Sequence, residues 1–370
     1  MKTKEMNIEV ANNKFAYKMA RQLFTEKENM FFSPYSIFSA FAQVYIGARK
    51  DTERQFQDAL DYGPQDIFHN SMNESMGRLE NFKENIFNIA NSLWAKSKDE
   101  FYTDFLTLLK ELYDSEINEV SFSEIVSKVN QWVSEKTNKK ITEIISEGDI
   151  SDKLLFILVN AVYFKGKWEK EFEKKDTKKR PFYTEEGEKK VDTMFMEEGF
   201  QYFEDEKYQF LSIPYKHHEV YMDILLPKKE YYLSSIDVGD FEKLEKKCYH
   251  RENIEIYLPK FKMEYGFFLN NFLENMGLRK AFNPAEADFS GIADISQPIY
   301  ISSAVHKAFV EVDEEGTEAA AATAVMMVRG CVVNTPPEKI IFRADHPFYF
   351  QIKSNTGEVL FLGKVEDPSC

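Results

Sequence analysis

Few residues of this 370-residue chain occur in the arrangements that enzymes use for catalysis. Asp345 and His346 set a carboxylate beside an imidazole, but no serine or cysteine nucleophile is associated with this pair. His217 and His218 are adjacent, so on a strand their side chains would point in opposite directions, a poor arrangement for a metal ion. The sequence contains no G-x-S-x-G elbow, no G-x-x-x-x-G-K-S/T phosphate loop, no H-E-x-x-H motif and no C-x-x-C pair. We therefore expect that the protein is not an enzyme and holds no metal ion or other cofactor.

One peptide bond in the chain carries a side chain that suits a particular class of protease. The bond Arg329-Gly330 suits a protease with an acidic specificity pocket, because a guanidinium pairs bidentately with a carboxylate. The apolar residues Met326, Met327 and Val328 just before it leave a chymotrypsin- or elastase-like protease open. The arginine makes a trypsin-like protease the first choice.

The segment that leads to this bond is compatible with two conformations. Its alanines, within residues 314–324, favour a helix. Gly316 supplies a flexible point, and no proline lies between it and Arg329 that would interrupt a ladder of hydrogen bonds. If the segment is a strand, one of its faces carries only uncharged side chains, from Thr317, Ala319, Ala321, Thr323, Val325 and Met327. The same segment can therefore be an exposed helical loop or a buried strand.

Several motifs along the chain resemble those of the serpins, a family of serine protease inhibitors. Residues 314–324 resemble the hinge and reactive-centre loop of the family, and residues 342–350 resemble its C-terminal signature. Further segments resemble family motifs and occur in the family's order, at residues 31–37, 45–52, 159–168, 258–262, 276–278, 287–292 and 305–309. The resemblance spans about residue 12 to the end and is specific because the motifs occur together.

The resemblance implies suicide inhibition of a serine protease, with a loop at about 313–336 held outside the native fold from about residue 316 as bait. After cleavage and formation of the acyl-enzyme, residues 316–329 would insert as a strand into a central β-sheet. The implied hinge consists of Glu314, Glu315, Gly316, Thr317, Glu318, Ala319, Ala320, Ala321 and Ala322. Small uncharged residues here match the inhibitory pattern; a non-inhibitory serpin that acts as a carrier, storage protein or chaperone is the alternative.

The resemblance also implies roles for residues outside the loop. Ser33, Ser36, Asn160 and His306 match a polar cluster that lies under the opening sheet in serpins. Trp168 matches the aromatic residue near the point where insertion begins. Mutation of any of these residues should trap or polymerise the protein without changing its target.

The scissile bond has two candidates. The family's usual spacing, counted from Glu314 as the hinge glutamate, makes residue 330 the last before the cut, and Arg329 lies one residue short of it. Gly330-Cys331 is therefore a formal alternative to Arg329-Gly330, but glycine is a poor specificity residue. We prefer Arg329-Gly330, interpret Cys331 as a bystander thiol, and keep a cysteine protease as a further possible target.

Charge and composition limit the classes of molecule that the protein can be expected to bind. A net charge of −15 argues against nucleic acid, which needs a basic face. A local run, Lys174–Arg180 and Lys170, could bind a polyanion, but interleaved acidic residues favour a solvated face. No apolar run of about 18 residues occurs, so we expect no membrane span. Three scattered cysteines and an N-terminus without an apolar stretch predict a cytoplasmic protein, or one released without a conventional signal peptide. The resemblance to the serpins implies a monomer that meets its target protease in a covalent complex.

The periodicity of the chain predicts the elements that would position these residues. Apolar spacing predicts helices at about 12–24, with a capping asparagine at Asn12, at 125–145, and after Ser33 or Ser36 with Pro34 in the first turn. The apolar run 154–164 predicts a strand covered on both faces. Alternation predicts further strands at 87–94, 210–214, 220–226, 254–258, 340–342 and 359–365. We predict an α+β fold in one domain, 1–370, with helices packed on large mixed β-sheets and an exposed reactive-centre loop.

Overall fold

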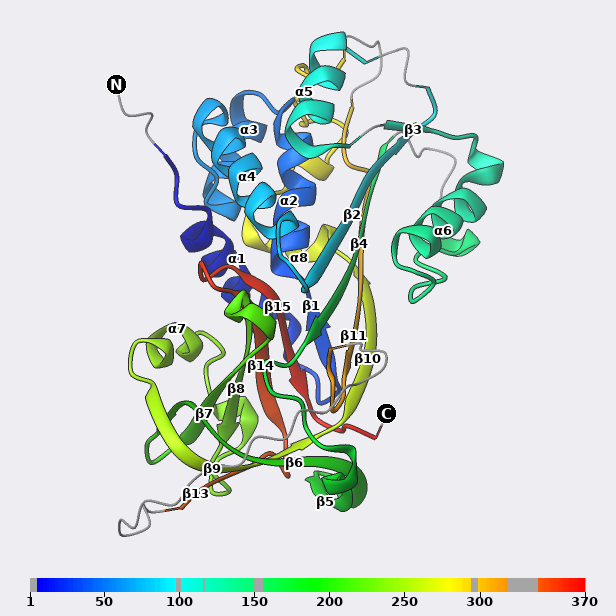
Figure 1. Ribbon diagram of the computed structural model, residues 1–370. Coiled ribbons are helices and arrows are strands. Elements are labelled where there is room, and N and C mark those ends of the chain that lie inside the picture. The colour runs from blue at the N-terminus through cyan, green and yellow to red at the C-terminus, as the bar shows by residue number, and fades with distance from the viewer. Residues whose placement is uncertain are drawn as a thin grey trace.

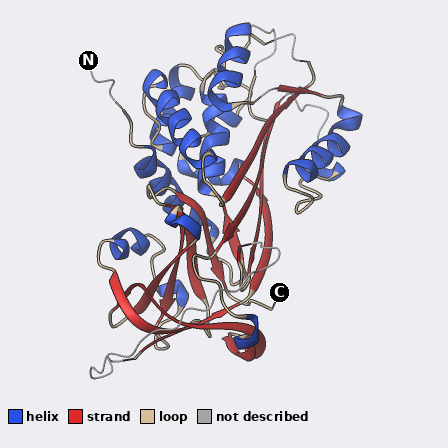
Figure 2. Ribbon diagram, in the orientation of Figure 1, coloured by secondary structure: helices blue, strands red, loops and turns tan. Residues whose placement is uncertain are grey.

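The computed structural model describes residues 5–97, 101–115, 117–149, 156–293, 299–317 and 339–369. Within these ranges the chain forms helices gathered mainly at one end and strands that run toward the other end (Figure 2). The helices are α1 (Ile8–Leu23), α2 (Pro34–Tyr45), α3 (Lys50–Leu60), α4 (Gln65–Glu80), α5 (Thr103–Tyr113), α6 (Ile125–Lys136), α7 (Asp240–Glu245) and α8 (Asn270–Met276). The predicted α+β class is confirmed.

Two β-sheets form the frame (Figure 1). The six-stranded sheet has the order β10-β11-β12-β4-β2-β3, and the larger sheet has the order β1-β15-β14-β8-β7-β6-β9-β13, with β5 paired to β6. The strands of the six-stranded sheet are β2 (Ile86–Ala95), β3 (Ile117–Glu119), β4 (Phe156–Lys167), β10 (Phe261–Phe268), β11 (Ser303–Val312) and β12 (Gly316–Thr317). Those of the larger sheet are β1 (Met30–Phe32), β5 (Lys178–Thr184), β6 (Gly187–Glu204), β7 (Tyr208–Pro214), β8 (Val220–Pro227), β9 (Tyr249–Pro259), β13 (Ile340–Arg343), β14 (Phe348–Ser354) and β15 (Val359–Val365).

The central strand β4 is covered on both faces, as its continuous apolar run predicts. Val159 and Ala161 pack in a cluster with Val129 and Val133 of α6, whereas Leu158 and Val162 belong to the main core. On that second face β4 packs against α2, all of whose residues are buried. Figure 1 shows α6 on one side of β2 and β4 and the other helices opposite. The two layers leave most of β4 buried on both faces.

The helix that follows Pro34 begins as predicted. Ser33 is the N-cap residue, and its hydroxyl accepts a hydrogen bond from the backbone N–H of Ser36 at 3.2 Å. Pro34 occupies the first turn, where a missing N–H costs nothing. Of the two serines considered as caps, Ser33 is therefore the one used.

Three local expectations are wrong. The first helix begins at Ile8 with Asn7 as its cap, while Asn12 is buried inside it and donates to the carbonyl oxygen of Val359 at 3.0 Å. The helix expected at 125–145 ends at Lys136, and the chain continues as turns in which residues 138 and 139 have positive φ. His217 and His218 lie in a 3-10 turn with positive φ, not on a strand.

Candidate reactive-loop hinge and sheet-opening cluster

The hinge begins where β11 ends. After Val312 the chain turns at residues 313–315 and returns as β12, which lies between β11 and β4. Gly316 faces Lys167 and Thr317 faces Gly166 in an antiparallel pairing with β4, and Thr317 also faces Val312 of β11. Two residues of the expected loop are thus part of the six-stranded sheet.

Only glycine fits at position 316. Its φ is +147°, and a Cβ atom there would lie 2.1 Å from the carbonyl oxygen of Gly166. That distance is far inside van der Waals contact, so the missing side chain permits the close approach of β12 to β4. The flexible point expected at Gly316 is therefore also a steric requirement.

The expectation that the chain lies outside the fold from about residue 316 is wrong for Gly316 and Thr317. Gly316 is buried and Thr317 is 0% exposed. The Thr317 hydroxyl forms a hydrogen bond of 2.6 Å with the hydroxyl of Tyr215. The rest of the hinge and the cleavage site lie outside the described residues, namely Glu318, Ala319, Ala320, Ala321, Ala322, Arg329, Gly330 and Cys331.

Two hinge carboxylates are buried and paired with lysines. Glu314 accepts from Lys260 Nζ at 2.7 Å and from the hydroxyl of Thr177 at 2.8 Å. Burial alone would raise the pKa of Glu314, but these hydrogen bonds lower it below its usual value. Glu315 is paired with Lys174 at 2.5 Å, and its side chain is only 6% exposed. One lysine of the basic run thus acts as a partner of the hinge.

Trp168 holds the hinge turn from the β4 side. Its indole N–H donates to the carbonyl oxygen of Asp313 at 2.9 Å, and its backbone N–H donates to that of Glu315 at 3.0 Å. The ring stacks on Tyr215 with centroids 4.4 Å apart. Trp168 therefore contacts the turn that leads into β12, and its expected role in insertion stays a prediction. Tyr215 was missed, and since it contacts the hinge from a distant turn, no local sequence signal marks it.

The four residues of the expected sheet-opening cluster lie together. His306 Nε2 accepts from the backbone N–H of Ser33 at 3.1 Å, so Nδ1 carries the proton and donates to Asn160 Oδ1. Asn160 Nδ2 donates to the carbonyl oxygen of Ser36 at 3.1 Å and to its hydroxyl at 2.5 Å. All four residues are fully buried. Burial lowers the pKa of His306 to about 3, so the imidazole is neutral at ordinary pH.

A fifth member, Asn91, was missed by the sequence analysis. His306, Asn160 and Asn91 face one another across β11, β4 and β2 and form one polar row. Asn91 Oδ1 accepts from Asn160 Nδ2, and Asn91 Nδ2 donates to the hydroxyl of Ser39 at 2.9 Å. Asn91 is one of three polar residues in this strand, with Asn88 and Ser92, so the sequence of the strand did not single it out. The row links the strands that must separate if another strand enters between β11 and β4.

The structure also bears on the basic run, on metal binding and on membrane spans. Of the basic run, Lys170, Lys174, Lys175 and Lys179 each lie within ion-pair distance of a carboxylate. In the described ranges, no group of three or more His, Cys, Asp or Glu residues is arranged to hold a metal ion. Among the helices that the structure describes, none is long and apolar enough to cross a membrane.

Comparison with known proteins identifies the class of the whole chain. A family model described as Serpin (serine protease inhibitor) matches residues 10–368. Human Serpin B8 is 35% identical over 97% of this chain and 98% of its own length. The native crystal structure of the thermophilic serpin tengpin has a TM-score of 0.87 and 30% identity, covering 99% of this chain and 96% of that one.

The similar structures also include human thyroxine-binding globulin complexed with thyroxine, with a TM-score of 0.86 and 25% identity and with 97% of each chain covered. The chain belongs to the serpin family. Serpins are generally inhibitors of proteases and not catalysts, and their typical partners are target proteases. The resemblance seen in the sequence is confirmed.

Proposed function

We propose that the protein is a suicide inhibitor of serine proteases, most specifically of trypsin-like enzymes. The protease attacks Arg329-Gly330 and forms an acyl-enzyme, and residues 316–329 then enter the six-stranded sheet. The acylated protease travels with the new strand, and its active site is deformed before deacylation. The observation that supports this proposal is the position of β12, whose two residues already pair between β11 and β4.

The energetics of insertion favour the proposal. Below β12, residues 303–309 of β11 pair directly with residues 157–163 of β4. An entering strand replaces this one ladder with two, one on each side, so the number of backbone hydrogen bonds rises. About 13 residues at roughly 3.3 Å each span about 40 Å, similar to the length of the 12-residue strand β4.

The side chains of the hinge are compatible with burial. Thr317 is already enclosed, and the next residues on its face are Ala319, Ala321 and Thr323, which carry no charge. Burying an unpaired charge there would cost several kcal/mol. This pattern favours an inhibitor over a carrier, storage protein or chaperone, although the similar thyroxine-binding globulin keeps the carrier as the alternative.

The test is incubation with trypsin followed by denaturing electrophoresis. We expect a covalent complex that survives SDS, and we expect sequencing of the released fragment to begin at Gly330. A fragment that begins at Cys331 would instead place the cut at the alternative bond Gly330-Cys331. An Arg329→Ala variant should lose the complex with trypsin while it stays folded. Clean cleavage without any complex, with trypsin and with chymotrypsin-like, elastase-like and cysteine proteases, would refute inhibition and favour the non-inhibitory alternative.

We propose a cellular compartment for this activity from the composition of the chain. With three scattered cysteines the chain has no disulfide framework, which suits a reducing compartment. We propose that the protein acts as a monomer in the cytoplasm, or after release without a conventional signal peptide. Cell fractionation and size-exclusion chromatography test both statements.

A further inference from the structure

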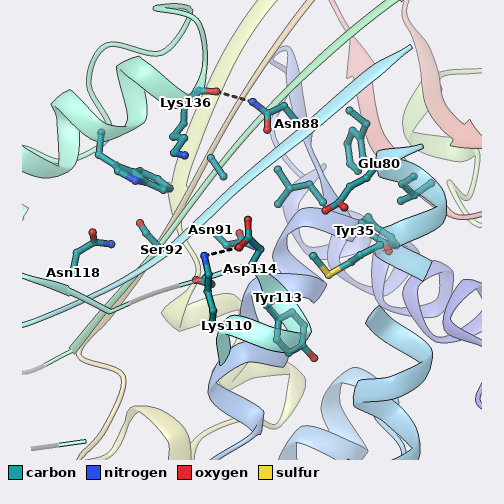
Figure 3. A pocket seen from close by; sticks show the side chains of 17 residues that line it. Tyr35, Glu80, Asn88, Asn91, Ser92, Lys110, Tyr113, Asp114, Asn118 and Lys136 are labelled. Carbon is teal, nitrogen blue, oxygen red and sulfur yellow. Dashed lines mark hydrogen bonds and ion pairs between the residues drawn. The ribbon is translucent and has the colours of Figure 1, made fainter. Parts of the chain in front are cut away.

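Two cavities of similar volume lie in different parts of the molecule. The first, of about 470 Å³, lies between β2 and the helices α4, α5 and α6, and its lining includes the ion pair of Lys110 with Asp114 (Figure 3). The second, of about 480 Å³, lies beside the larger sheet, between the end of β5, the loop after β8 and the segment that leads into β14. Tyrosines line both cavities, but those of the first are buried and those of the second are exposed.

Three tyrosines from two segments surround the second cavity. Tyr183 comes from β5, and Tyr231 and Tyr232 come from the loop after β8. Tyr232 is 76% exposed, the largest exposed fraction among the large apolar and aromatic side chains of the described residues. Leu233 and Pro347 add aliphatic surface to the same lining. A group of exposed rings around one cavity is typical of a surface that binds another molecule.

The charged groups of this lining balance one another. Two lysines and two glutamates line the cavity. Lys27 Nζ donates to both carboxylate oxygens of Glu185, at 2.8 and 2.7 Å. Lys229 Nζ lies 3.3 Å from a carboxylate oxygen of Asp345, and Glu366 accepts from a lysine of β15 at 3.2 Å. Since each of the four lining charges has a partner of opposite sign, the cavity favours a neutral ligand over an ion.

The same groups can still form hydrogen bonds with a ligand. A carboxylate oxygen has two acceptor positions, and each oxygen of Glu185 uses one of them for Lys27. In the described part of the chain, Glu366 Oε2 has no hydrogen-bond partner. Lys229 Nζ, 5.4 Å from the centre of the Tyr183 ring, supplies a donor at the same cavity. The lining therefore combines exposed rings with both acceptors and donors.

Sugar rings carry the complementary groups. Their C–H groups form an apolar face that packs against an aromatic ring, and their hydroxyls both donate and accept hydrogen bonds without adding charge. The volume of the cavity lies within the range of ligand sites, roughly 300–1,000 Å³. We propose that this cavity binds a neutral oligosaccharide, with one sugar ring packed on Tyr232 and with hydroxyls bonded to Glu185 and Glu366.

The oligosaccharide site does not rest on the proposed inhibition of proteases. Among the described residues that line the cavity, none belongs to the hinge or to the polar row. A bound sugar would therefore hold the protein on a glycan surface and leave β4, β11 and β12 unchanged. We expect the form cleaved within residues 325–335 to bind with the same affinity as the uncleaved protein.

The probes for the test are cellohexaose, maltohexaose and chitohexaose, measured by isothermal titration calorimetry and saturation-transfer NMR on the uncleaved full-length protein. We expect at least one probe to bind saturably, one molecule per chain, with the strongest transfer to the C–H protons of its rings. Tyr232→Ala should weaken that binding about tenfold, whereas Tyr232→Phe, which keeps the ring, should weaken it less than about threefold. Glu185→Gln should weaken it severalfold, since the acceptor loses its charge. Tyr249→Ala, which removes another exposed ring outside the cavity, is the matched control and should bind normally.

Further outcomes separate the site from its alternatives and from the proposed function. Binding of none of the three probes, or unchanged affinity in both Tyr232→Ala and Glu185→Gln, overturns the site. Dextran sulfate, an anionic glucan, should not displace the bound probe; displacement would show a site for polyanions instead. Different affinities of the cleaved and uncleaved forms would overturn the independence from the loop. A parent protein that binds a probe but forms no covalent complex with trypsin would overturn the proposed function and leave the binding result intact.

Discussion

Gly316 allows the hinge to lie against β4 because it has no Cβ atom. A methyl group there would collide with Gly166, and the backbone has a φ that other residues rarely adopt. We predict that Gly316→Ala displaces β12 from between β11 and β4 and lowers the free energy of unfolding by about 1–3 kcal/mol. Hydrogen exchange at the Thr317 amide should become fast. Gly77→Ala, where a Cβ meets nothing within 4 Å, is the control. Unchanged protection of Thr317 would contradict this account.

Thr317 is the first hinge side chain that must be buried. It is 0% exposed and bonded to Tyr215, so an arginine at this position would have to leave the sheet or bury its charge. We predict that Thr317→Arg converts the protein from an inhibitor into a substrate of trypsin. Electrophoresis should show cleaved chain and no SDS-stable complex. Thr317→Ser, which keeps the hydroxyl, should still form the complex; retained inhibition by Thr317→Arg would argue against insertion.

His306 makes stability depend on pH. Burial lowers its pKa from 6.5 to about 3, so the unfolded chain binds this proton more tightly than the folded chain. Its contribution to stability is complete above about pH 6.5 and is lost as the pH falls toward 3. Between pH 7 and pH 5 the free energy of unfolding should fall by about 2 kcal/mol from this residue.

Urea unfolding at a series of pH values measures this effect. His69, whose pKa burial lowers to about 4, adds a loss of the same sign and similar size. His306→Gln should therefore remove about half of the decrease in the free energy of unfolding between pH 7 and pH 5. His250→Gln is the control, because that ring is about half exposed. A slope that His306→Gln leaves unchanged would show that the imidazole is not the group responsible.

At the scale of elements, the polar row joins three strands, and it crosses the pair β11 and β4 that would part on insertion. Asn160 bonds to His306 on β11, to Asn91 on β2 and to Ser36 on α2. We predict that Asn160→Ala leaves these buried partners unsatisfied and lowers the free energy of unfolding by about 2–3 kcal/mol. The loosened sheet should also accept strands from other copies, seen as polymers on a native gel after mild heating.

Asn88→Ala is the matched control for this prediction. Asn88 lies on the same strand, β2, but donates to the carbonyl oxygen of Lys136 near the surface. Asn88→Ala should lower the free energy of unfolding by about 1 kcal/mol or less and should give no polymers on the native gel. Equal effects of the two substitutions would mean that the row has no special role in keeping the strands together.

The sequence predicts the elements whose signals are local and misses features that depend on distant partners. The strand at 154–164 and the helix after Pro34 follow from an apolar run and from a capping serine. Asn7 caps the first helix, whereas Asn12 lies inside it and donates to the carbonyl oxygen of Val359, which is 347 positions away. The burial of Thr317 depends on Tyr215, 102 positions away, and no periodicity encodes that contact. The cluster of Ser33, Ser36, Asn160 and His306 came from the family resemblance, not from spacing.

At the scale of the whole molecule, the proposed mechanism requires a native sheet that is one strand short of its most stable form. If the proposed mechanism holds, cleavage in the loop lets the segment enter and exchanges one ladder for two. We predict that the form cleaved within residues 325–335 melts at least about 10 °C higher than the uncleaved protein, because several kcal/mol are gained. Differential scanning calorimetry before and after cleavage measures this shift. Identical melting temperatures would refute a metastable native state.

The first two rungs that β12 makes with β4 also bear on timing. An inhibitor of this kind competes with hydrolysis of its own ester bond to the protease, and the slowest part of forming any ladder is starting it. If the proposed mechanism holds, Gly316 and Thr317 have begun the ladder with β4 before cleavage, and only its extension remains to compete with hydrolysis. The same arrangement is a hazard. Because β12 already separates β11 from β4 at one end, the loop of a neighbouring molecule can enter between these strands as readily as the protein's own loop.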